Sequence, residues 1–170
     1  IVNNVDEIYS ERNTTKGKLN VNIKMFDSKM KYRTWTGGGH KIHSTNTFME
    51  TKHDLMLLLG KTPEEINNDK NDLSVSTISI NRDVEGSNGW KNIPHLFKTL
   101  NHTTRYVVLR NFESFNENKF EGDIDILTDD PLGVQFILRA KKIHKNKRRS
   151  AFLVKLIDKD ISFDIRCIED

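Results

Sequence analysis

Three aspartates stand within apolar, strand-like segments, and this pattern constrains the fold of the chain more than any other feature. Asp123 and Asp125 are two residues apart and alternate with Ile124 and Ile126. On a β-strand both acids therefore point to one face and both isoleucines to the other. Asp164 stands in the same alternating pattern further along the chain. The sequence thus predicts two half-buried strands that carry three carboxylates on their polar faces.

Carboxylates that lie close together on a sheet repel one another unless a positive charge lies between them. A divalent metal ion supplies that charge, and Mg²⁺ binds carboxylate oxygens together with the phosphate oxygens of a substrate. The spacing of Asp123 and Asp125, with Asp164 as a third acid, is typical of a two-metal site for phosphoryl transfer. A solvated polar face of the sheet is the alternative interpretation of the same spacing.

The sequence around these acids resembles the polymerase-beta-like nucleotidyltransferase superfamily. It looks like the uncharacterised nucleotidyltransferase-like domains with a "VVLRN...GDIDIL" signature, which often stand beside genes for carbohydrate biosynthesis. The resemblance covers about residues 92–168 and rests on three segments, Tyr106 to Asn111, Gly122 to Leu127 and Phe163 to Arg166.

In that superfamily the first two acids lie on one strand, the third lies on a neighbouring strand, and all three hold metal ions that position a nucleoside triphosphate. The resemblance implies these metal-binding roles for Asp123, Asp125 and Asp164, with two Mg²⁺ ions and with Asp164 also as the catalytic residue. The implied reaction transfers a nucleoside monophosphate from the triphosphate to a hydroxyl acceptor. We expect a sugar or a sugar phosphate as acceptor, because the family is associated with glycan biosynthesis.

One motif of the superfamily is replaced in this chain. Its usual Gly-Ser pair begins a helix whose N–H groups hold the triphosphate, whereas the corresponding loop here runs from Leu109 to Ser114. We therefore assign the phosphate contacts to Arg110 and Asn111. Gly122 is assigned as a further nucleotide-binding residue, and Arg166 as a candidate anion contact. The missing pair favours an alternative function, a non-catalytic nucleotide-binding or interaction domain of a larger multidomain enzyme.

A glycine-rich segment near the start of the chain, Gly37 to Gly39, is a second candidate for ligand contact. Glycines let the backbone approach a ligand closely, and Lys41 follows them as a candidate anion contact. A mobile turn is the alternative interpretation, because the spacing fits neither a P-loop nor a dinucleotide-binding fingerprint.

We expect an α+β fold in two parts. Residues 1–82 form a small α+β unit of unassigned role, residues 83–91 a linker, and residues 92–170 a nucleotidyltransferase-like mixed sheet flanked by helices. In the first part, alternation from Leu19 to Met25 predicts a strand, and Tyr32 to Trp35 is its expected hairpin partner.

Helices are predicted at several places. Thr47 and Glu50 form a capping box at the start of the first helix, and Gly60 ends it. A second, short helix is predicted to start at Thr62 to Glu65, because Pro63 suits the first turn of a helix. Another helix is predicted from Ile93 to Leu100. The segment from Leu132 to Ala140 is interpreted as a further short helix, although its apolar residues also alternate as in a strand.

Composition excludes several classes of protein. The 170 residues are 35% hydrophobic and 30% charged, and a formal net charge of +3 is too small to indicate a nucleic-acid partner. No apolar run approaches the roughly 20 residues of a membrane span. A single cysteine, Cys167, excludes an intramolecular disulfide and favours a reducing compartment, so we predict a cytoplasmic location. Because the chain begins at Ile1 without a methionine and stops soon after Asp164, we expect other domains of the same polypeptide as partners.

Overall fold

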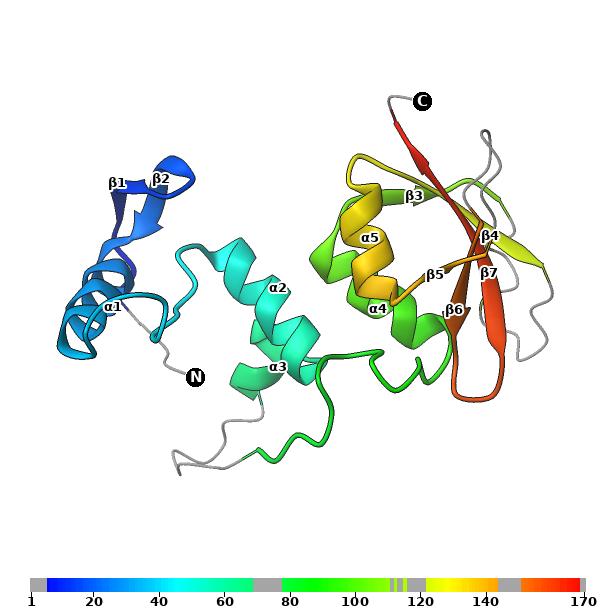
Figure 1. The fold of residues 1–170 in the computed structure, drawn as a ribbon, viewed down its shortest axis with the longest axis horizontal. Helices are drawn as coiled ribbons and strands as arrows, with labels where there is room; N and C mark the ends of the chain where they lie inside the picture. The colour runs from blue at the N-terminus through cyan, green and yellow to red at the C-terminus, as the bar shows by residue number, and fades with distance from the viewer. Residues whose placement is uncertain are drawn as a thin grey trace. The chain divides into compact units, whose positions relative to one another are not determined.

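The computed structural model of this chain describes residues 6–68, 78–110, 112, 115, 122–143 and 151–168. The chain divides into two compact units, Ile1–Asp54 and Leu55–Asp170 (Figure 1). The first contains a two-stranded sheet and the second a five-stranded mixed sheet with helices, so the predicted α+β class is confirmed. Within the described ranges, no helix has the length and apolar character needed to cross a membrane.

Strands β1 (Tyr9–Thr14) and β2 (Gly17–Asn22) form an antiparallel hairpin in the first unit, and helix α1 (Ile23–Trp35) follows directly. Asn22 ends the strand and caps the helix, because its side-chain oxygen accepts a hydrogen bond from the backbone N–H of Met25 at 3.2 Å.

The predicted hairpin of this unit is wrong in its second arm. The strand expected over Leu19 to Met25 ends at Asn22, and the residues Tyr32 to Trp35 lie in the last turns of α1. The partner of β2 is instead β1, which precedes it in the sequence. Apolar residues continue to alternate past Asn22, so the pattern favoured a longer strand, whereas the capping hydrogen bond starts a helix there.

Helices α2 (Phe48–Leu59) and α3 (Pro63–Asn68) follow. The predicted first helix is confirmed, since the backbone N–H of Glu50 donates to the hydroxyl of Thr47 at 3.1 Å. Gly60 ends α2 with a φ of +66°, a left-handed conformation that glycine adopts without strain.

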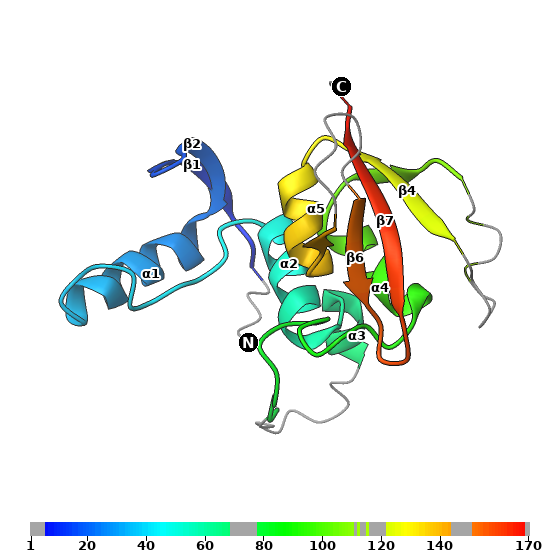
Figure 2. The ribbon, with the colours of Figure 1, turned by 45° about the vertical axis from the view of Figure 1, so that its right-hand side comes forward.

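The second unit is built around a sheet in the order β3-β4-β7-β6-β5 (Figures 1 and 2). Strands β4 and β7 are parallel, and the other neighbouring strands are antiparallel. The last two predicted helices are confirmed as α4 and α5. The elements in chain order are α4 (Ile93–Thr103), β3 (Tyr106–Val108), β4 (Asp123–Thr128), α5 (Pro131–Leu138), β5 (Lys141–Lys142), β6 (Ala151–Lys155) and β7 (Asp160–Cys167).

Helices α4 and α5 pack on one face of this sheet. The apolar residues that alternate with the acids on β4 and β7 are buried and belong to one cluster with residues of both helices. Burying such a side chain contributes about 1.5–3 kcal/mol, so this face fixes the strands against the helices. The cluster includes Ile124, Ile126, Phe163 and Ile165 from the strands and Leu96, Leu100, Val134 and Leu138 from the helices. The three acids stand on the opposite face.

The segment predicted as a linker, residues 83–91, packs within the second unit. Trp90 is completely buried, and its backbone N–H donates to the carbonyl of Lys155 at 2.9 Å. Its indole N–H donates to the carbonyl of Leu138 at 3.2 Å. Trp90 thus ties this segment to β6 and α5, and the two compact units divide between Asp54 and Leu55.

Candidate metal centre

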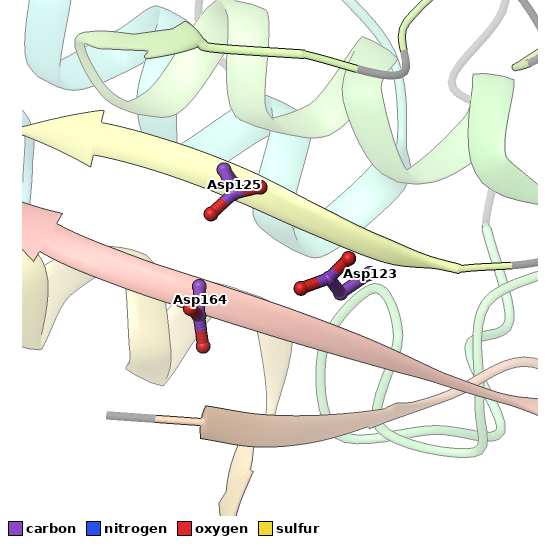
Figure 3. Close-up of side chains that lie close together, drawn as sticks. All are labelled: Asp123, Asp125 and Asp164. Atoms are coloured by element: carbon purple, nitrogen blue, oxygen red, sulfur yellow. The ribbon is translucent and has the colours of Figure 1, made fainter. Parts of the chain in front are cut away.

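The three aspartates lie on neighbouring parallel strands. Register places Asp125 on β4 directly beside Asp164 on β7, and Asp123 beside Ser162. Figure 3 shows the two acids of β4 on the yellow strand and Asp164 on the salmon-coloured β7 next to it. The predicted arrangement of two acids on one strand and a third on its neighbour therefore holds in the structure.

Burial of the isoleucines decides which way the acids face. Ile124 and Ile126 are completely buried on the helix-covered side, so the strand turns Asp123 and Asp125 to the other side. Asp125 is only 2% exposed and Asp164 only 7%, whereas 43% of the Asp123 side chain is exposed. The site is thus open at Asp123 and closed around Asp125.

The carboxylates come close enough to share a metal ion. One oxygen from each of Asp123, Asp125 and Asp164 lies within 4.8 Å of the other two. Two ligands on opposite sides of one Mg²⁺ ion are separated by about 4.2 Å, because each Mg–O distance is about 2.1 Å. Oxygen ligands are also those that hard divalent cations prefer. The three residues therefore offer the oxygen ligands of a hard divalent cation and lie close enough together to bind a metal ion.

Arg110 lies beside the first two acids. Its Nε donates a hydrogen bond to Oδ2 of Asp125, and its Nη2 is 3.6 Å from Oδ2 of Asp123. The hydrogen bond to Asp125 raises the pKa of Arg110, and the negative charges of Asp125, Asp123 and Asp164 act in the same direction. Arg110 is therefore a charged partner of the acids.

Arg166 lies on the other side of the same carboxylate. Its Nη2 donates to Oδ1 of Asp125 at 3.2 Å and is 3.6 Å from Oδ2 of Asp164. Both oxygens of Asp125 are thus engaged by guanidinium groups. Two arginines therefore face the three acids from the described part of the chain.

The other predicted site residues have separate outcomes. Gly122 lies directly before β4 with a φ of +134°, which L side chains rarely adopt. Among the described residues, its chain neighbours apart, no atom lies within 4 Å of the position that a Cβ would take. Asn111 lies outside the described residues. Lys41 belongs to the first unit, where its Nζ donates to the carbonyl of Thr36 at 2.6 Å. The anion contact proposed for Lys41 stays a prediction.

Ser162 is the residue of this face that sequence analysis missed. It is the register partner of Asp123 and stands two residues before Asp164, so its side chain lies on the acid face. The signal was present in the sequence, because Ser162, Asp164 and Arg166 alternate with apolar residues on one strand. Its hydroxyl adds a neutral polar group to the acid face beside Asp123.

Comparison with protein-family models, with curated proteins and with solved structures found no match for this chain.

Proposed function

We propose that the second unit is a nucleotidyltransferase-like domain of the polymerase-beta-like superfamily. It binds Mg²⁺ and a nucleoside triphosphate and transfers the nucleoside monophosphate to a hydroxyl acceptor. The observation that supports this proposal best is the convergence of Asp123, Asp125 and Asp164 from two adjacent parallel strands, with their oxygens within 4.8 Å. A solvated face gives no reason for two of its three acids to be buried.

Each residue of the site has a chemical role in this proposal. Asp123, Asp125 and Asp164 hold two Mg²⁺ ions, which when bound neutralise and orient the triphosphate. Asp164 accepts the proton of the acceptor hydroxyl. The oxygen of that hydroxyl forms a bond to the α-phosphorus as the bond to the β-phosphate oxygen breaks, and pyrophosphate leaves. Arg110 and the backbone at Gly122 contact the phosphates. Asn111 has the same proposed role.

The resemblance to the superfamily suggests both the acceptor of the transferred group and the partners of this domain. A sugar or a sugar phosphate is the proposed acceptor, and other domains of the same polypeptide are proposed partners. The cytoplasmic location stays a prediction from the single cysteine.

A non-catalytic nucleotide-binding or interaction domain is a second candidate, and one observation favours it. Arg110 and Arg166 engage both oxygens of Asp125, so the site has internal positive charges of its own. The same positive charges compete with a metal ion for the carboxylate. The absent Gly-Ser pair points in the same direction.

Thermal unfolding with each of the four nucleoside triphosphates, with and without Mg²⁺, tests nucleotide binding. A ligand that binds only the native state, present at a concentration of about 100 times its Kd, stabilises that state by roughly 2.7 kcal/mol. The midpoint of thermal unfolding therefore rises by several degrees. We expect a rise that requires Mg²⁺ and is lost in Asp123→Asn. Asp160→Asn is the matched control, since it removes the same charge from the exposed start of β7. If no triphosphate raises the midpoint, the proposal fails.

Release of pyrophosphate separates the two candidates. In a transferase, Asp164→Asn lowers the rate of transfer to sugar acceptors by at least about 100-fold, because the proton acceptor is lost. Asp164→Asn should keep part of the Mg²⁺-dependent rise of the midpoint, because the pair of acids on β4, Asp123 and Asp125, still binds metal. A domain that binds without catalysis releases no pyrophosphate in either form.

A further inference from the structure

Asp125 and its two arginines differ sharply in their access to solvent. The Asp125 side chain is 2% exposed, whereas the side chains of Arg110 and Arg166 are 58% and 49% exposed. The carboxylate is held by its strand within the sheet. The guanidinium groups sit at the ends of long, flexible side chains, so they are the members of this cluster that can change partner.

Each ligand of the proposed reaction meets a competitor in this cluster. A cation that approaches Asp125 encounters the positive charges of Arg110 and Arg166. A phosphate that approaches either arginine competes with the carboxylate that already accepts its hydrogen bonds. A cation and a polyphosphate that arrive together remove both conflicts, because the cation replaces the arginines at Asp125 and the phosphates replace Asp125 at the arginines.

We propose that Arg110 and Arg166 form a polyphosphate-binding pair whose internal counter-ion is Asp125, so that a divalent cation and a polyphosphate each raise the affinity of the site for the other. This inference rests on the proposed function, because it takes the three aspartates as the cation site. Direct contact between metal and phosphate couples the binding of the two ligands. The inference adds that the two arginines also contribute to this coupling. By linkage, the factor by which the cation strengthens polyphosphate binding equals the factor in the reverse direction.

Calorimetric titration of the whole chain with Mn²⁺, at fixed free concentrations of inorganic pyrophosphate, measures this coupling factor. Direct contact between the metal and pyrophosphate contributes to the factor in every variant. The difference between wild type and Arg166→Gln isolates the contribution of the arginine. Arg105→Gln is the matched control, because Arg105 forms its ion pair with Asp129, which is not one of the three acids.

We expect Arg166→Gln to bind Mn²⁺ alone more tightly than the wild type and to bind pyrophosphate more weakly. Its coupling factor should fall by about tenfold, within the usual range of coupling between two ligands. Arg110→Gln should act in the same way, and Arg105→Gln should leave all three quantities at their wild-type values. Arg166→Lys keeps the charge but not the planar fork, so it should give an intermediate coupling factor and serves if the glutamine variant does not fold.

Three outcomes would overturn the inference, and they separate it from the proposed function. If the wild type binds Mn²⁺ but Arg166→Gln has an unchanged coupling factor, the arginines stay with Asp125 and only this inference fails. If Arg166→Gln weakens Mn²⁺ binding, Arg166 orients the carboxylate for the metal, and again only this inference fails. If the wild type binds no Mn²⁺ with or without pyrophosphate, both the inference and the proposed function fail.

Discussion

Asp125 is the residue on which the candidate site depends most. It is the central acid of the three, and both of its oxygens accept hydrogen bonds from arginines. Its neighbours on β4, Ile124 and Ile126, are buried in the core, so the carboxylate cannot turn away without loss of that packing. A buried carboxylate is stable only when positive groups pair with it, and the guanidinium groups of Arg110 and Arg166 do so here.

The side chain of Tyr106 should make the stability of the protein depend on pH in the alkaline range. Burial raises the pKa of its hydroxyl to about 12 from an ordinary value of 10.0. Between these values the unfolded chain releases the proton first, so the free energy of unfolding falls as the pH rises, by at most about 1.4 kcal/mol per pH unit.

Urea unfolding at about pH 9 and about pH 11 measures this loss of stability, with Tyr106→Phe as the reference. The phenylalanine variant lacks the ionising hydroxyl but keeps the ring, which stacks against Phe97 with centroids 5.7 Å apart. Wild type should therefore lose more stability than the variant between the two pH values. An equal loss in both proteins would show that Tyr106 ionises freely in the folded state.

At the scale of elements, the parallel pair β4 and β7 brings the acids together. β7 forms a hairpin with β6, and the register of that hairpin places Ala151 beside Asp164. β4 then lies on the other side of β7, with Asp125 beside Asp164. A shift of one residue in the pairing of β4 with β7 would move Asp125 away from Asp164, so the register of these strands determines the geometry of the site.

The boundary between β2 and α1 gives a prediction for a single cap. Asn22→Ala removes the side-chain oxygen that accepts from the N–H of Met25 and should destabilise the protein by about 1 kcal/mol. Urea unfolding followed by circular dichroism measures the change. Asn20→Ala is the control, because Asn20 is an exposed residue of the same strand. Equal effects of the two substitutions would mean that Asn22 does not act as a cap.

At the scale of the whole molecule, each compact unit contains one of the two tryptophans. Trp35 in the first unit is 67% exposed, and Trp90 in the second is completely buried. A Trp35→Phe variant therefore reports on the second unit alone. Its fluorescence should lie at short wavelength in the native state and move to longer wavelength when that unit unfolds.

Ligands that bind the acid face should stabilise the folded second unit, whose unfolding the fluorescence of Trp90 reports. Under the proposed function, Mn²⁺ with pyrophosphate binds only the folded second unit and should therefore raise the midpoint of this transition in the Trp35→Phe variant. Addition of Asp123→Asn should remove most of the rise, since it takes away one of the three carboxylates. A native spectrum typical of an exposed indole would contradict the buried position of Trp90.

The sequence by itself determined the local features of this protein. Alternation placed Asp123 and Asp125 on one face of a strand and Asp164 on the polar face of a second strand, and Thr47 and Gly60 marked the ends of a helix. These signals lie within a few residues of one another, so backbone geometry and side-chain periodicity are enough to interpret them.

Only the tertiary structure decided which segments meet. The pairing of β4 with β7 and the contacts of Arg110 and Arg166 with Asp125 join residues far apart in the chain. Alternation does not say which strand is the neighbour of which, and it also continued past Asn22, where a capping hydrogen bond ends the strand. Long-range packing selects among partners that local patterns leave equivalent, and here it turned three separate acids into one candidate metal centre with two arginines beside it.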